Sequence, residues 1–533
     1  MGKIASLMEA SLAGLTNVLE FRQKPSNSNN VAHMSAASEK TAGFLSFVLR
    51  GNYNFRYLNI AVVGAIIQFT VFKVLYPYPD FISDSYSYIE TNLSHLKVNL
   101  WPIGYSKFLA GVHAISPSDN FLVFCQYAVL TGALLYFFFS IRYLFRLSKP
   151  ATVVLFIFLF FNPAFLYLSN AVLSDTLFLA LSLVLFTQIM HLLHRPKYFY
   201  IFSLALLTGV MFTLRYTAIY YPVAAIPVFL LSRLNKRAKV LGILAPLVFI
   251  IPFVIYTKQC TKEATGTAEF SVFGGWQIAN NALYMYDHIN LDTTSLPPAF
   301  LPFDRMVRDY LHRKNPSSYE LQHFPGTWYI KHQDAPLKSY MLIKMGSPIS
   351  SGDLKDWGRV SPIYNAYGTY LIKNNLLAFA QYYLLLNAQN YFIPHLEIFA
   401  TYNMGGNYIW SIGRNWFPIK KPFITAVSWS LPGNLFFVYP TLFLLLNVYF
   451  IFLFLQFVVT KRFKKTTPLV SHIVIASTVF LFLNFCFSVF ATPVVLRYQL
   501  FPMVLLLTCI LLIINKKKPD SQDELAGQKL NTI

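Results

Sequence analysis

The sequence predicts an all-α protein that crosses a membrane many times, and three observations carry this prediction. The 533 residues are 55% hydrophobic and only 12% charged, whereas a soluble chain of this length needs more polar surface. Long apolar segments recur along the chain, and basic residues collect between alternate segments. The net charge of +21 therefore indicates cytoplasmic loops rather than a nucleic-acid partner.

About ten segments are long enough, or nearly so, to cross a bilayer, for which a helix needs about 20 apolar residues. In chain order these predicted spans are 57–75, 120–140, 151–168, 172–190, 199–214, 217–232, 239–256, 434–459, 468–490 and 498–514.

The distribution of basic residues predicts the topology. If segment 1–56 lies inside, every second loop is basic, as the positive-inside bias requires. These loops carry Arg142, Arg146 and Lys149; His194, Arg195 and Lys197; Arg233, Lys236, Arg237 and Lys239; and Lys461, Arg462, Lys464 and Lys465. Lys516, Lys517 and Lys518 then begin an inside tail, 515–533. The short loops favour a bacterial cytoplasmic (inner) membrane.

This topology divides the chain into membrane and outer parts. Seven spans fall in 57–256 and three in 434–514, and the block 257–433 between them lies outside. Its Gly-Gly-Trp, Pro-Gly-Thr-Trp and Asp-Trp-Gly sequences predict turns, so we expect a small outer domain of mixed α/β or irregular structure. The apolar run 376–388 is too short to span and predicts an interfacial helix.

Three acids lie at the outer ends of predicted spans, where desolvation is costly and a carboxylate usually has a task. Asp84 follows the first span and is the strongest candidate, although a solvated loop acid is the alternative. Asp80 is explained locally by the Pro-Tyr-Pro-Asp turn. Asp175 begins the fourth span, where it or Ser174 is also suited to cap the helix.

Two arginines stand on the same outer side, against the charge bias. Arg215 and Arg497 are the only basic residues in their loops, and a tyrosine follows each. The planar guanidinium suits bidentate binding of phosphate. Snorkelling to the membrane interface is the alternative.

All seven tryptophans also fall in predicted outer segments. Indole faces pack against the C–H surfaces of sugars, so this distribution hints at contact with glycans or lipid headgroups; the size of the outer domain is the simpler explanation. They are Trp101, Trp276, Trp328, Trp357, Trp410, Trp416 and Trp429.

These residues suggest transfer of a sugar from a lipid phosphate. The chain has no His/Cys/Asp cluster with metal-ligand spacing and no glycine loop that would cradle a nucleotide phosphate. A donor carried on a lipid phosphate needs neither. Arginines would neutralise the leaving phosphate, and an outer carboxylate would take the proton of the attacking hydroxyl.

The chain resembles the GT-C glycosyltransferases, the multi-span class that includes protein O-mannosyltransferases and lipid A aminoarabinose transferases. Four short elements match in order: Asp84–Ile89 after the first span, the juxtamembrane Trp101–Leu109, Leu173–Phe178 opening the fourth span, and Arg497-Tyr498 with Pro502 in a late span. The first loop has Asp-Ser where many relatives carry Asp-Glu.

The resemblance implies a GT-C-like bundle, a polyprenyl-phosphate-linked sugar donor and an active site facing outside. It implies Asp84 as the base, Asp175 as its support or the acceptor's, and Arg497 as a ligand of the lipid phosphate. Arg215 joins Arg497 by topology alone. We expect the rim of the site to include Tyr88, Trp101, Tyr105 and Tyr498.

Several alternatives stay open at this level. The acceptor is a glycan, a lipid or a protein, and the requirement for a divalent metal is undetermined. A transporter or flippase for lipid-linked glycans would also place acids and arginines outside, although it more often has charges deep in its spans or an internal repeat. A non-catalytic scaffold of the same fold would tolerate loss of Asp84.

Overall fold

The computed structural model describes residues 43–313, 326–332, 334–346, 354–464, 466–491 and 493–515. These residues form helices and no strand, and extended backbone pairs only as isolated bridges. The all-α prediction is confirmed. The β part of the predicted outer domain is not found in the described residues.

Eight helical segments are long and apolar enough to span a membrane. They are α4 (Asn52–Leu75), α7 (Asp119–Leu144), α8 (Lys149–Phe160) with α9 (Pro163–Asn170), α10 (Asp175–His194), α13 (Lys236–Thr265), α23 (Leu431–Phe436) with α24 (Tyr439–Val459), α25 (Pro468–Phe490) and α26 (Leu496–Ile514). The chain is a multi-pass membrane protein.

Ten spans are not confirmed. The other two predicted spans fall on shorter apolar helices, α11 (Tyr198–Leu214) and the continuous pair η1 (Tyr216–Tyr220) and α12 (Tyr221–Leu231). Each is shorter than any of the eight candidate spans, so neither is counted among them.

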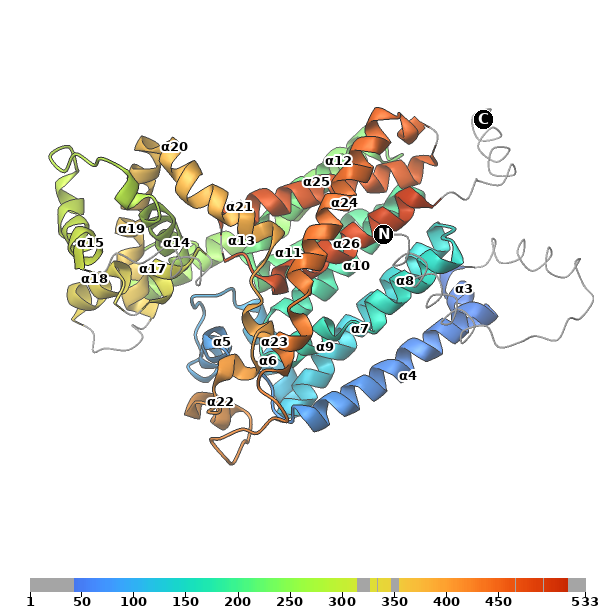
Figure 1. The fold of residues 1–533 in the computed structure, drawn as a ribbon, viewed down its shortest axis with the longest axis horizontal. Helices are drawn as coiled ribbons and strands as arrows, with labels where there is room; N and C mark the ends of the chain where they lie inside the picture. The colour runs from blue at the N-terminus through green and yellow to red at the C-terminus, as the bar shows by residue number, and fades with distance from the viewer. Residues whose placement is uncertain are drawn as a thin grey trace, which may run out of the picture.

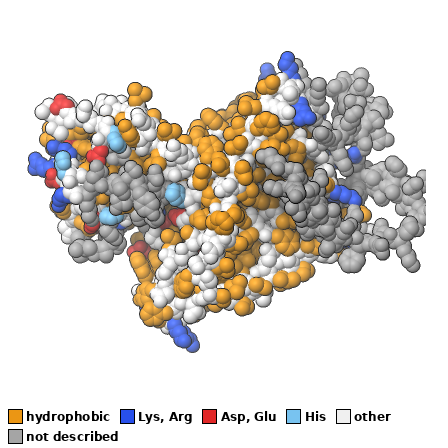
Figure 2. Space-filling model, in the orientation of Figure 1, with side chains coloured by type: hydrophobic (Ala, Val, Ile, Leu, Met, Phe, Trp, Pro, Cys, Tyr) orange, Lys and Arg blue, Asp and Glu red, His pale blue; other side chains and the backbone are white. Residues whose placement is uncertain are grey.

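The candidate spans differ in how deeply they are buried in the bundle. α10 and α26 are buried along most of their length, whereas only a small part of α4 and of α13 is buried. Hydrophobic side chains cover the visible face of the bundle (Figure 2), as expected for a surface that faces lipid. The acids and arginines discussed below lie at helix ends, outside this apolar surface.

The two ends of the bundle differ in chemistry. We call the end where α10 and α26 begin the site end, because Asp175 and Arg497 stand there. The predicted basic loops lie at the opposite end, where the amide Nδ2 of Asn515 donates to the carbonyl of Arg146 at 2.7 Å. Segment 1–42 and the lysines 465 and 516–518 lie outside the described residues.

Residues 272–383 form a second body with its own hydrophobic core, which we call the distal domain (Figure 1). The side chains of Trp276, Phe303, Tyr364 and Tyr367 fill this core. Its helices are α14 (Val272–Leu283), η2 (Tyr286–His288), η3 (Pro298–Phe300), α15 (Leu301–Arg313), α17 (Trp328–Lys331), α18 (Pro336–Met345), α19 (Leu354–Asn374), α20 (Leu376–Phe379) and the π-helical turn η4 (Ala380–Leu384).

Two sequences predicted as turns in this region are helical instead. The Gly-Gly-Trp sequence lies inside α14, and the Asp-Trp-Gly sequence lies inside α19. A Cβ on Gly275 would collide with the backbone of Ser361, so this glycine lets α14 and α19 approach closely. The glycine serves helix packing rather than chain reversal.

The predicted outer block 257–433 contributes to two cores. Beyond the distal domain, Tyr391, Phe399, Tyr402 and Phe417 pack into the core of the bundle. The remaining helices at or near the site end are α5 (Ser83–Leu93), α6 (Gly104–Ile115), α21 (Leu385–Phe392), η5 (Glu397–Phe399), η6 (Tyr402–Gly405) and α22 (Ser411–Trp416). Short α3 (Phe44–Arg50) and η7 (Arg462–Lys464) complete the described chain.

The predicted interfacial helix 376–388 corresponds to α20, η4 and the start of α21. It is tied to the end of α25, because the amide of Asn387 donates to the carbonyl of Val489 at 3.2 Å. This segment joins the distal domain to the bundle.

Candidate active site

Six charged side chains meet at the site end, and we call them the charge cluster. Four are predicted site residues, and two, one acid and one lysine, are additional. The cluster consists of Asp84, Asp175, Glu397, Arg215, Lys331 and Arg497. Three acids and three bases balance in number, which limits the cost of burying them.

Asp175 forms the centre of the cluster. It is the first residue of α10, where the helix dipole favours a carboxylate. Its Oδ1 lies 2.5 Å from Nη1 of Arg215, and its Oδ2 lies 3.0 Å from Nη1 of Arg497. The side chain is only 4% exposed. The predicted cap is not formed: Ser174 holds the N-cap position without a side-chain cap bond, and Asp175 pairs with arginines.

Arg497 is surrounded by acids and is almost completely buried. Its side chain is 3% exposed at the start of α26, so it does not snorkel to solvent. Besides Asp175, it contacts Glu397, with 2.7 Å between Nε and Oε2 and 3.5 Å between Nη2 and Oε1. The Nε–H does not point at Oε2, so the shorter contact is an ion pair rather than a hydrogen bond. Nη2 also lies 3.9 Å from Oδ2 of Asp84.

Glu397 was not predicted from the sequence. An isolated bridge between His395 and Val495, with the amide of Leu496 donating to the carbonyl of His395 at 2.8 Å, brings Glu397 beside Arg497. Its backbone φ is +51°, in the left-handed region that non-glycine residues seldom adopt. The only available signal was an acid within a largely apolar stretch, Ile-Pro-His-Leu-Glu-Ile-Phe.

Lys331, also not predicted, reaches the cluster from the distal domain. It ends α17, and its Nζ lies 3.7 Å from Oε1 of Glu397. The side chain is 42% exposed, so it is the most accessible member of the cluster. Nothing in the local sequence distinguishes it from other lysines of the block.

Asp84 is the least tightly held acid of the three. It lies in the first turn of α5, and its side chain is 22% exposed. Its closest basic partner is Arg497 at 3.9 Å, beyond hydrogen-bond distance. Burial raises the pKa of the Asp84 carboxyl, an effect that the charge of Arg497 opposes. Its Oδ1 accepts only a long hydrogen bond from Oγ of Ser83, at 3.4 Å, and its Oδ2 is held by no closer cation than Arg497, so the carboxylate can accept a proton.

The four predicted rim residues have different surroundings. The ring of Tyr498 lies under both arginines, 4.2 Å from Cζ of Arg215 and 4.7 Å from Cζ of Arg497. Such cation–π contacts hold the two guanidinium groups together despite their like charge. Tyr498 is thus part of the cluster.

Tyr88 and Tyr105 are buried beside the cluster rather than at an accessible rim. The hydroxyl groups of Tyr88 and Ser174 lie 3.2 Å apart, and Tyr105 donates to Oε1 of Gln126 at 2.8 Å. These bonds satisfy buried hydroxyls and fix the helices around the site. Trp101 is half-buried against Phe273 of the distal domain, with 5.0 Å between ring centroids.

Asp80 has a structural role that is not local. Its amide donates to the carbonyl of Asn170, and its carbonyl accepts from the amide of Val172, both at 3.0 Å. Burial raises the pKa of the Asp80 carboxyl to about 7, an effect that the nearby backbone amide of Asn403 opposes. Asp80 therefore ties the first loop to the segment that leads into Asp175, which corrects the expectation of simple turn chemistry.

The tryptophans do not form a common binding surface. Trp276 stacks on Trp357 at 3.9 Å in the distal core, and Trp328 and Trp416 are buried. Only Trp410 is exposed, at 58%, and it stacks on Tyr86 at 4.8 Å between centroids. The glycan-contact hypothesis therefore excludes the buried Trp276, Trp328 and Trp416, and Trp410 is the most exposed of the tryptophans that stay candidates.

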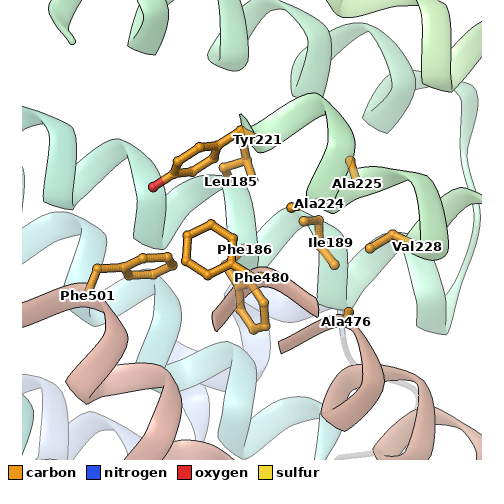
Figure 3. Close-up of a pocket in the computed structure, with 10 residues that line it drawn as sticks. All are labelled: Leu185, Phe186, Ile189, Tyr221, Ala224, Ala225, Val228, Ala476, Phe480 and Phe501. Carbon is orange, nitrogen blue, oxygen red and sulfur yellow. The ribbon is translucent and has the colours of Figure 1, made fainter. Parts of the chain in front are cut away.

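An apolar pocket in the bundle does not supply a substrate site. It lies among α10, α12, α25 and α26 and is lined by side chains that include Leu185, Phe186, Tyr221, Phe480 and Phe501 (Figure 3). Its cavity volume of about 10 Å³ holds about one water molecule. Tyr221 is the only hydroxyl-bearing residue of the lining, and its hydroxyl pairs with Ser182 at 2.8 Å.

Within the described residues, no group of three His, Cys, Asp or Glu side chains is arranged to hold a metal ion. The acids of the charge cluster face cationic side chains instead. Comparison with models of protein families, with curated proteins and with solved structures gave no match. The geometry of the charge cluster is therefore the basis for a functional assignment.

Proposed function

We propose that this protein is a glycosyltransferase that moves a sugar from a polyprenyl-phosphate donor to an acceptor on the extracytoplasmic side of the membrane. The observation that carries the proposal is the charge cluster. It combines the buried Arg497 and the largely buried Arg215 with a loosely held carboxylate at the end of an apolar bundle. The order of the four GT-C-like sequence elements supports the same assignment.

The arginines are suited to bind the donor's phosphate. Arg215 and Arg497 share Asp175 and the ring of Tyr498, so their guanidinium groups are held in fixed positions before a ligand binds. Preorganised cations stabilise charge that develops on a leaving group, and more so where water is excluded. A lipid-borne donor reaches them from the bilayer without a nucleotide-binding fold.

Asp84 is suited to act as the base. Its shortest contact with a cation, 3.9 Å, is longer than those of Asp175 and Glu397. Its side chain is also the most exposed of the three acids. Asp175, by contrast, is engaged by two arginines. The raised pKa of Asp84 makes its carboxylate a stronger proton acceptor. A base of this kind contributes about 10²–10⁴-fold to the rate.

The proposed transfer forms one bond, breaks one bond and moves one proton. The acceptor's hydroxyl oxygen forms a bond to the anomeric carbon of the sugar, and the bond from that carbon to the phosphate oxygen breaks. The hydroxyl proton passes to Asp84. The polyprenyl phosphate leaves with the bonding electrons, and Arg215 and Arg497 neutralise its charge.

The distribution of charge supports an enzyme over a transporter. In the eight described span candidates, acidic and basic residues lie toward the helix ends and the middle of each helix is uncharged. Transporters commonly bind substrate near the middle of the bilayer, at broken helices or charged side chains. The charge cluster instead lies at one end of the bundle.

Transfer of a labelled sugar from a polyprenyl-phosphate donor to acceptors in native membranes tests the proposal. Wild-type protein should form glycosidic product, and Asp84→Asn should lower the turnover rate by about 10²–10⁴-fold, because the proton has no acceptor. The control is Glu90→Gln, an exposed acid on the same helix, which should leave the rate unchanged.

Movement of the intact donor between leaflets without any product would instead favour a flippase. No product and no movement with wild-type protein would favour a non-catalytic scaffold. Unchanged turnover in Asp84→Asn would remove Asp84 from the role of base.

A further inference from the structure

Each nitrogen of the Arg497 guanidinium group faces at least one carboxylate in this arrangement. Its Nη1 contacts Asp175, its Nε contacts Glu397, and its Nη2 contacts both Glu397 and Asp84. A donor phosphate that takes either of the two close contacts of Arg497, with Asp175 or with Glu397, must therefore replace a carboxylate. The contacts of each acid indicate which one moves.

Asp175 is the least able to leave. It is fixed at the start of a buried helix, it is 4% exposed, and its two oxygens contact two arginines. Removing it would leave Arg215 buried without an acidic partner, which is strongly unfavourable. Asp84, at 3.9 Å, makes too long a contact to block the guanidinium.

Glu397 is positioned to leave. It lies at the start of a one-turn helix, η5, rather than in a long helix. Its backbone is left-handed, at φ +51°, a conformation that is strained for a residue other than glycine. Such strain is commonly found at ligand clamps and switch segments. Rotation of this backbone would withdraw the carboxylate from Arg497.

The position that Glu397 occupies suits a phosphate. Its carboxylate lies between Arg497, at 2.7 Å, and Lys331, at 3.7 Å. Arginine binds phosphate oxygens in a planar fork, and lysine binds them as a mobile point charge. Lys331 is 42% exposed and belongs to the distal domain, so it can follow a larger anion.

We propose that Glu397 holds the place of the donor's phosphate between Arg497 and Lys331, and that the phosphate displaces it on binding. Lys331 is then a third phosphate-binding residue, and it links the distal domain to donor binding. This inference rests on the proposed function, because it assigns the donor's phosphate to the same cluster. Without donor, the carboxylate keeps the two cations neutralised and excludes other anions.

Binding of farnesyl phosphate, a short prenyl phosphate, to the purified full chain tests this by titration calorimetry. Glu397→Gln keeps the side-chain volume and removes the competing charge, so its Kd should be about tenfold lower than that of wild type. Lys331→Ala should raise the Kd about fivefold, since an exposed charge contributes less. Farnesol, which lacks the phosphate, should bind all variants alike.

Two matched controls isolate the effect of the site. Glu90→Gln and Lys344→Ala alter exposed charges elsewhere in the chain and should leave the Kd of farnesyl phosphate unchanged. Equal melting temperatures of wild type and Glu397→Gln would show that the fold is intact.

The outcomes separate this inference from the proposed function. Equal or weaker binding of farnesyl phosphate by Glu397→Gln, in a protein that transfers sugar, would overturn the inference alone. Tighter binding by Glu397→Gln in a protein that transfers no sugar would uphold the phosphate site and overturn the glycosyltransferase. Absence of farnesyl phosphate binding in every variant would overturn the inference directly.

Discussion

Two buried acids in this molecule have opposite surroundings. In the distal domain, Asp304 is fully buried, and its Oδ1 accepts from the hydroxyls of Tyr286, at 2.6 Å, and Tyr367, at 2.9 Å. Its Oδ2 accepts from Nε of Arg308 at 3.0 Å. Two of the three hydrogen bonds to this carboxylate therefore come from neutral hydroxyl groups, and one comes from a charged side chain.

The charge cluster has a different organisation. Three acids share Arg497, one of them at 3.9 Å, and another stands on a left-handed backbone. A buried acid that only stabilises a fold is expected to resemble Asp304, because unpaired or competing charges are costly. The difference indicates that the distal site serves structure and that the charge cluster serves binding and chemistry.

The largest expected effect on stability comes from removing Arg497 from the charge cluster, and Arg308, the basic partner of Asp304, is the matched residue of the distal domain. Arg497→Ala should lower the free energy of unfolding by about 3–5 kcal/mol, because it leaves buried acids uncompensated. Arg308→Ala should cost only about 1 kcal/mol, since that side chain is 40% exposed and two tyrosines still bond Asp304. Thermal unfolding in detergent checks both.

A double variant sharpens this prediction. Adding Glu397→Gln to Arg497→Ala should recover part of the stability, since it removes one unpaired charge. No recovery, or an equal loss in the two arginine variants, would contradict the contrast between the regions.

A smaller effect concerns Asp80, whose pKa burial raises to about 7. The ordinary value is about 3.9, so the folded state holds this proton more tightly than the unfolded state does. Stability from this group is therefore lost as the pH rises from about 4 through 7. Asp80→Asn should raise the melting temperature by a few degrees at pH 8 and by little at pH 5.

The matched control is Asp292→Asn in the distal domain, at a carboxyl whose pKa is lowered by bonds from Thr294. This variant should give no gain at pH 8. A gain in Asp80→Asn that is equal at both pH values would contradict the assignment of a buried, protonated carboxyl.

The sequence predicted the part of the site that depends on topology. Asp175, Arg215 and Arg497 stand at span ends, so the alternation of basic loops is enough to place them on one side. Asp84 follows from its position after the first span. Their contacts within 4 Å connect residues far apart in the chain, and only the chemistry expected for a lipid-phosphate donor and the resemblance suggested that they act together.

The parts that were missed depend on packing between distant segments. Glu397 reaches Arg497 through a bridge between His395 and Val495, and Lys331 arrives from another domain. Neither arrangement leaves a periodic signal. The expected β structure failed for a related reason: Gly275 serves close helix packing, and a glycine in sequence does not distinguish this from a turn.

The most direct test of the contrast compares Asp84→Asn with Asp304→Asn in the same preparation, measuring sugar transfer and melting temperature for each. We expect Asp84→Asn to lose transfer while it keeps or raises the melting temperature, because removing a crowded charge relieves strain at a functional site. Asp304→Asn should keep transfer and lower the free energy of unfolding by about 1–3 kcal/mol. Full transfer in Asp84→Asn, together with a loss of stability as large as that of Asp304→Asn, would contradict the account.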